Sequence, residues 1–142
     1  MYEVFEHTAD LGLRARAETL EELFAESARA LFSVIVANLD EVAPVIQLNF
    51  TIAGAQLDFL LFDWLSELVY TYEMQRVVLS DFSVKLIPDG LTAVARGEAV
   101  DEARHQLDHE VKAITYHGLK IARVESGDGQ QTGWMAEVIV DI

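Results

Sequence analysis

The spacing of apolar residues constrains this fold most, because it changes along the chain between a helical and a strand period. In residues 20–36 and 55–72 apolar side chains recur every three or four positions, which places them on one side of a helix. In the second segment Phe59 and Phe62 widen the apolar side. We therefore expect this helix to lie deep against a sheet, with both rings in the core.

The other segments alternate apolar and polar residues, as strands do. The predicted strands are residues 1–6, 11–17, 45–53, 77–87, 91–101, 119–124 and 133–141. The apolar phase shifts between Leu79 and Phe82, which indicates a β-bulge. Pro88–Gly90 is a hairpin turn signal, and residues 126–129 are a second predicted turn.

Capping residues define the helix ends. Thr19 is a suitable N-cap for the first helix, and Glu22 completes a capping box. A short helix is predicted between Asp108, as its cap, and Gly118, as its end. The order predicts an α+β fold with a largely antiparallel or mixed sheet of about seven strands, two main helices packed on it and one short helix. A chain of 142 residues suits a single domain, residues 1–142.

Charge and composition exclude several classes of function. The chain has 24 Asp and Glu against 10 Lys and Arg, a formal net charge of −14. Such a chain repels nucleic-acid phosphates and anionic membranes, which leaves cations and basic proteins as partners. The absence of cysteine excludes disulfides and thiolate metal sites and fits a reducing cytoplasm. We see no targeting signal and no segment apolar enough to span a bilayer, and expect a cytoplasmic protein.

Two acidic positions suggest a cation site. His7, Thr8, Ala9 and Asp10 form a loop between two predicted strands, with no Asn-Gly or Asp-Gly turn. At the other end Asp141 and the carboxylate of Ile142 are one residue apart. Held rigidly, these anionic groups favour a hard cation such as calcium or magnesium, which prefers oxygen ligands. A solvated, frayed end is the alternative.

Other polar groups are weaker signals. Glu98, Asp101, Glu102 and His105 follow the long hairpin, and acidic turns are common. The four histidines lack zinc-enzyme spacing, and the chain has no nucleophile elbow and no P-loop. Lys112, in EVKAITYHG, forms an exposed ion pair or holds a phosphate. If this stretch is helical, Lys112 and Tyr116 lie on one side.

Several segments together resemble the archease family. They are HTADLGL with TLEELFAESARALF after it, DFLLFDWLSELVYTYE, ARGEAVDEARHQLDHEVKAITYHGLKI and the final WMAEVIVDI. The resemblance runs nearly end to end, and HTAD, KAITYH and a final Asp-Ile are specific in combination. One position departs, because the family usually has proline where this chain has Gln106.

The resemblance implies an accessory protein of tRNA splicing and RNA repair, with no catalytic cycle of its own. Its protein partner would be an RtcB-type, GTP-dependent RNA ligase, which joins a 3′-phosphate or 2′,3′-cyclic phosphate end to a 5′-hydroxyl. The accessory protein promotes guanylylation of the ligase, which gives repeated turnover and broader nucleotide use.

The resemblance also implies the site. A metal, seen in the family as calcium, is held at the positions of Asp10, Asp141 and Ile142; magnesium and manganese stay open. The first loop must then meet the end of the last strand, with Lys112 as the cation that offsets the crowded carboxylates.

Other family positions point to a partner or a nucleotide, such as the ligase's GTP. Lys112 corresponds to a functionally important lysine. Three further family-typical positions are His7, Glu98 and His117.

Two other functions are open on the residues alone. A metal-dependent phosphohydrolase would use an acid cluster and a divalent cation to activate water. An acidic, chaperone-like module for basic proteins would use its surface charge alone and would tolerate the loss of Asp10 and Asp141.

Overall fold

The computed structural model describes residues 1–7, 9–125 and 131–142. The elements in chain order are β1 (Tyr2–His7), β2 (Asp10–Ala17), α1 (Leu20–Ile35), the 3-10 helix η1 (Leu39–Glu41), β3 (Ile46–Ala53), α2 (Leu57–Gln75), β4 (Val77–Ile87), β5 (Gly90–Ala99), β6 (Ala113–Ile114), β7 (Lys120–Glu125) and β8 (Gln131–Asp141). The predicted turn at residues 126–129 lies outside the described residues.

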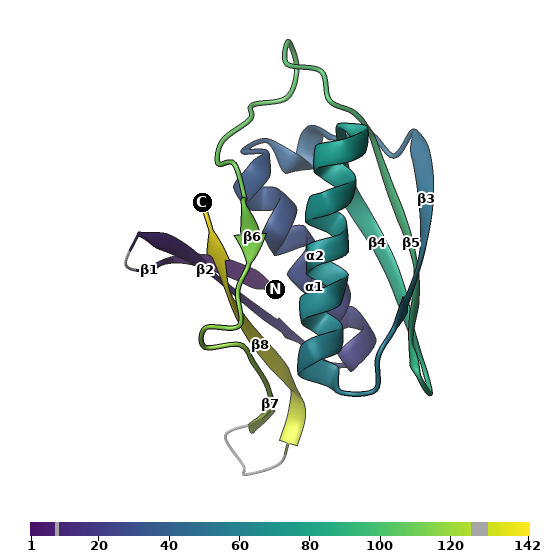
Figure 1. Ribbon diagram of the computed structural model, residues 1–142, viewed down its shortest axis with the longest axis vertical. Coiled ribbons are helices and arrows are strands. Elements are labelled where there is room, and N and C mark those ends of the chain that lie inside the picture. The colour runs from purple at the N-terminus through teal and green to yellow at the C-terminus, as the bar shows by residue number, and fades with distance from the viewer. Residues whose placement is uncertain (8, 126–130) are drawn as a thin grey trace.

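The α+β class is confirmed, and the strands divide into two antiparallel sheets instead of one. Sheet 1 has the order β1-β2-β8-β6, and β7 also pairs with β8. Sheet 2 has the order β3-β5-β4, with the predicted bulge between Leu79 and Asp81. Figure 1 shows the two sheets on either side of the helices. The C-terminus lies beside β6 and the β1–β2 hairpin.

Helix α1 is buried between the sheets, because it packs on both β2 and β4. Thr19 caps it as predicted, since its hydroxyl accepts a hydrogen bond from the Glu22 backbone N–H at 3.1 Å. The carboxylate of Glu21, in the first turn of α1, accepts a hydrogen bond from the Leu86 N–H at 2.7 Å, and Leu86 belongs to the edge strand β4. In α2, Trp64 donates its indole N–H to the Phe24 carbonyl at 3.1 Å, which joins the two helices.

The predicted short helix between Asp108 and Gly118 is wrong. Between these residues the chain is extended and forms only the short strand β6, which pairs with β8. The Asp108 and His109 N–H groups donate to the carbonyls of Ile35 and Val34, at 2.8 and 3.0 Å. The last turn of a helix leaves its carbonyls without partners within the helix. Satisfying α1 in this way fixes the segment in an extended path, which its local sequence pattern does not reveal.

No helix among the described residues is long and apolar enough to cross a membrane.

Candidate functional site

The registers of three strands place His7, Asp10 and Asp141 in one row across sheet 1. His7 is opposite Asp10 in the β1–β2 hairpin. Leu11 is opposite Val140 in the β2–β8 pair, which makes Asp10 and Asp141 the next neighbours along these strands. Directly opposite side chains have Cβ atoms about 4.5–5.5 Å apart. The first loop therefore meets the end of the last strand, as expected, through the pairing of β2 with β8.

This row lies on the outer face of sheet 1. Leu13 and Val138 are buried on the inner face, and Asp10 and Asp141 stand an odd number of positions from them, hence on the other side. The same outer face carries Arg14, whose Nε donates to Glu137 Oε1 at 2.8 Å. Side chains of β2 and β8 thus reach one another across this face.

The hairpin turn that presents Asp10 has an uncommon backbone. Ala9 has φ +62°, in the left-handed region, without being glycine or asparagine. A tight two-residue hairpin turn requires positive φ, and an L-residue with a Cβ pays about 1–2 kcal/mol for it. The chain keeps a strained residue beside the candidate site, which is where such strain tends to be found.

Strand β6 brings Lys112 to the same end of sheet 1. The Lys112 backbone N–H donates to the Asp141 carbonyl at 2.8 Å, and Ala113 pairs with Asp141. The Lys112 side chain is exposed and forms no ion pair with any residue that the structure describes. Ile142 is tied down, because its side chain packs against the core. Backbone pairing thus brings Lys112 and three oxygen-bearing positions to the same end of sheet 1, although it is Ala113 that lies opposite Asp141, so that alternation points the Lys112 side chain to the other face.

The turn after β6 adds a histidine pair. Thr115 Oγ1 donates to the Ile139 carbonyl at 2.9 Å and accepts from the His117 N–H at 3.3 Å. This holds the His117 ring 5.3 Å from the His7 ring, between centroids. His7 Nδ1 is buried and has no hydrogen-bond partner among the described residues. Both predicted histidines therefore belong to the same end of sheet 1 as Asp10.

The donor chemistry at this end fits a hard cation. Asp10, Asp141 and the carboxylate of Ile142 offer oxygen atoms only, as calcium and magnesium prefer. Among the described residues no three His, Cys, Asp or Glu side chains come close enough together to hold a metal ion. The expected ligand set contains only two such side chains, those of Asp10 and Asp141, and its third ligand is the main-chain carboxylate of Ile142. The three-ligand assignment therefore stays a prediction.

Glu98 belongs to a different cluster. Its Oε1 contacts His105 Nε2 at 2.6 Å and forms an ion pair with Arg104, and it accepts the Ala43 N–H at 3.3 Å. The Asp101 N–H donates to His105 Nδ1 at 2.9 Å, which leaves Nε2 to donate to Glu98. The His105 hydrogen bond, then the Ala43 N–H and Arg104, hold the pKa of Glu98 below its ordinary value against the opposing effect of burial.

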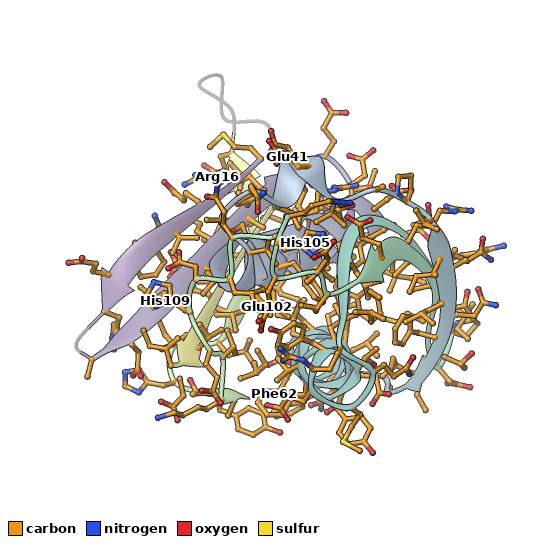
Figure 2. The ribbon with its side chains drawn as sticks, turned by 90° about the horizontal axis from the view of Figure 1, so that it is seen from above. Arg16, Glu41, Phe62, Glu102, His105 and His109 are labelled. Atoms are coloured by element: carbon orange, nitrogen blue, oxygen red, sulfur yellow. The ribbon has the colours of Figure 1, made fainter. Side chains whose placement is uncertain are left out.

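This cluster fastens the loop after β5 to sheet 2. Figure 2 shows His105 within the fold rather than at its edge, and its side chain is 0% exposed. The contacts of Glu98 are thus structural ones, and none of them reaches Asp10 or Asp141.

An open cleft lies at the other end of β2, about 23 Å along the strand from Asp10. It has a volume of about 1010 Å³ and lies between β2, β4 and the start of α1. Its cations are already paired: the N-terminal amine and Arg29 with Glu26, and Arg16 with Glu3. Among the described residues that line this cleft, no cation is left without an anionic partner to bind a phosphate.

The aromatic side chains of Phe59 and Phe62 lie beside the site and differ in burial. Phe59 is 49% exposed, so placing its ring in the core was wrong, whereas Phe62 is partly buried and packs against the core. Phe62 stacks on Tyr116, with ring centroids 3.9 Å apart and planes 9° apart, and Phe59 meets Tyr116 edge-on at 5.8 Å. Figure 2 shows Phe62 at the outer edge of the molecule. Asp63, one helical turn after Phe59, was the available signal of an exposed side.

Comparison with known proteins gives a consistent result. A sequence model of the archease protein family matches residues 2–142. The chain is 41% identical to an archease of Pyrococcus furiosus, over 99% of this chain and 98% of that one. It is 42% identical to an archease of Methanopyrus kandleri, over 99% of each.

Solved structures share the fold. The solution structure of protein 1598 of Methanobacterium thermoautotrophicum superposes with a TM-score of 0.82 at 34% identity, over 99% of this chain and 98% of that one. The crystal structure of a Thermotoga maritima protein, described as an archease and possible chaperone, has a TM-score of 0.63 at 22% identity and is similar in fold. The match over the whole length, together with the HTAD and KAITYH segments meeting at one end of sheet 1, shows that this chain belongs to the archease family.

Proposed function

We propose that this chain is a non-catalytic accessory protein that activates a GTP-dependent RNA ligase. Membership of the archease family supports an accessory role. The observation that carries the proposal is the pairing of β2 and β6 with the end of β8, which brings Asp10 and Lys112 to Asp141. Nucleotide phosphates carry negative charge, and this end offers carboxylate oxygens that can hold a cation and the exposed ammonium group of Lys112.

In this proposal Asp10, Asp141 and the Ile142 carboxylate hold a divalent ion, with calcium the first candidate and magnesium or manganese as alternatives. The ion supplies positive charge that offsets phosphate or carboxylate oxygens of the partner. The protein's own residues do the positioning. The β6–β8 pairing fixes the backbone of Lys112, and His117 lies against His7 in the row. Glu98 acts at a distance by fastening the loop that leads to β6.

The test is guanylylation of the ligase from the same source, at a substoichiometric amount of this protein. Wild-type protein is expected to raise turnover strongly, whereas Asp10→Ala and Lys112→Ala are expected to lose most of the rise. A variant extended by a few residues past Ile142 should fail as well, because it loses the carboxylate but keeps every side chain. Asp89→Ala, in the exposed β4–β5 turn, is the matched control.

The same experiment separates the other functions. Full activity of Asp10→Ala and Asp141→Ala would favour an acidic chaperone-like module. Hydrolysis of phosphate esters by the protein alone, with magnesium or manganese, would favour a phosphohydrolase. No rise in guanylylation with the wild-type chain would refute the proposed activation.

A further inference from the structure

Helix α2 has an exposed side that is apolar and acidic together. Its inner side is buried through Leu61, Trp64 and Leu68. On its outer side Tyr70 is 57% and Met74 65% exposed. A helix that is apolar all round is normally buried all round. Figure 1 shows α2 in front of the other elements, with no strand over it. This side is therefore suited to a partner.

The turn after β6 extends this surface. Tyr116, 57% exposed, packs against Phe62 and Phe59. Stacking and the Thr115 hydrogen bond to Ile139 hold the tyrosine ring in place before any partner arrives. A rigid aromatic anchor loses little entropy on binding, which is why aromatic residues often dominate interfaces. We call Phe59, Phe62, Tyr70, Met74 and Tyr116 the α2 surface.

A hollow adjoins the α2 surface at the start of the helix. It has a volume of about 620 Å³ and lies between α2 and β7, with Leu57, Ile121 and Trp134 in its lining. Asp58, next to Phe59, is also part of the lining, and so is Lys120, which is paired with Glu137 at 3.9 Å. Such a hollow beside exposed rings can take a side chain that protrudes from a partner.

Charge decides which partner fits. Residues 57–75 contain four carboxylates and no Lys or Arg. Asp63, Glu67 and Glu73 are exposed and form no ion pair with the described residues. Anionic partners, nucleic acid included, are therefore repelled. Arginine is favoured on the partner, since guanidinium both pairs with carboxylates and stacks on tyrosine or phenylalanine rings.

We propose that the α2 surface docks a basic, arginine-bearing surface of the partner ligase, apart from the groups that act at the end of sheet 1. The two regions are continuous, because Tyr116 adjoins His117, which contacts His7 opposite Asp10. A ligase held on α2 therefore has its nucleotide site within reach of Asp10 and Lys112. This inference rests on the proposed function.

The experiment measures both binding and activation with the purified ligase. Glu67→Lys/Glu73→Lys reverses the charge, and Tyr70→Ser/Met74→Ser removes exposed apolar groups. Each is expected to raise Kd about tenfold or more. Glu18→Lys/Asp89→Lys makes the same charge change away from α2, at exposed positions, and should bind within about twofold of wild type. Thermal unfolding of each variant confirms that it is folded.

The outcomes separate this inference from the proposed function. Asp10→Ala should bind the ligase normally and fail to activate it, whereas the α2 variants should regain activation at high concentration. If wild type activates the ligase but both folded α2 variants bind like wild type, the docking inference is overturned and the activation stands. A wild-type dimer, seen by sedimentation and lost in the α2 variants, would identify a second copy as the occupant and overturn it too. A chain that neither binds nor activates the ligase would overturn both.

Discussion

At the residue scale, Ala9 shows how strand pairing can hold a short loop in a conformation that its own residue type disfavours. The two-residue connection between β1 and β2 requires positive φ, which glycine or asparagine supply easily. Ala9 adopts φ +62° instead, at the turn that sets Asp10 opposite His7. The β1–β2 and β2–β8 pairings on both sides of Asp10 hold the turn in this conformation.

Relieving this strain should stabilise the protein. Ala9→Gly is expected to raise the free energy of unfolding by about 1 kcal/mol, because glycine has no Cβ to clash at positive φ. Urea unfolding measures the change. Ala99→Gly, at an exposed strand position, is the matched control and should lower stability by about 0.5–1 kcal/mol. If Ala9→Gly and Ala99→Gly lowered the free energy of unfolding equally, the claim that Ala9 is strained would be contradicted.

At the element scale, the segment between β5 and β6 works as a strap. It closes the last turn of α1 through Asp108 and His109 and bridges Val36 to Leu107. At its start, Glu98 and His105 fasten it to β5. The strap leads into β6 and so places Lys112 at the edge of β8. The position of the lysine therefore depends on contacts made far from the candidate site.

Removing the Glu98 charge should loosen the strap in a pH-dependent way. The folded-state pKa of Glu98 is lowered, chiefly by the His105 hydrogen bond. Its contribution is therefore present above the ordinary value of 4.5 and is lost as pH falls through the lower folded value. Glu98→Gln should cost about 1–3 kcal/mol at pH 7, and its difference from wild type should shrink by pH 3.5.

Urea unfolding at the two pH values measures the Glu98 effect, with Glu102→Gln as the control. Glu102 is exposed on the same strap and should show almost no effect at either pH. A Glu98→Gln deficit that is the same at pH 7 and pH 3.5 would show that the charge is not its source.

At the scale of the whole molecule, two antiparallel sheets enclose α1, and their edges meet the two candidate surfaces. Sheet 1 ends in the row of His7, Asp10 and Asp141, and α2 beside it carries the exposed aromatic and acidic side. The chain has a net charge of −14, so cation binding also relieves general repulsion. In the proposed function, one divalent ion would therefore support both stability and activity.

Calcium should therefore stabilise the folded protein. At a concentration 100 times its Kd, an ion that binds only the folded state adds about 2.7 kcal/mol, which raises Tm by roughly 5–10 °C in a chain of this size. Calorimetry with and without chelator measures the shift. Asp10→Asn and Asp141→Asn should lose it, whereas Asp89→Asn should keep it. A shift of equal size in all three variants would place the ion elsewhere.

The sequence by itself determined most of the elements, because hydrophobic period and capping act over a few residues. Both main helices, the Thr19 cap, the Leu79 bulge and the strand alternation were predictable for this reason. HTAD and KAITYH were recognisable as candidate site segments because they resemble a family, although spacing alone did not join them.

Only the tertiary structure decided which segments lie side by side. Strand pairing put Asp10 beside Asp141 and drew β6 out of a predicted helix, because the carbonyls at the end of α1 needed partners. It also divided one expected sheet into two and left Phe59 exposed. Pairing between distant strands and the choice of the buried helix side are set by what the rest of the chain can cover, which local periodicity does not contain.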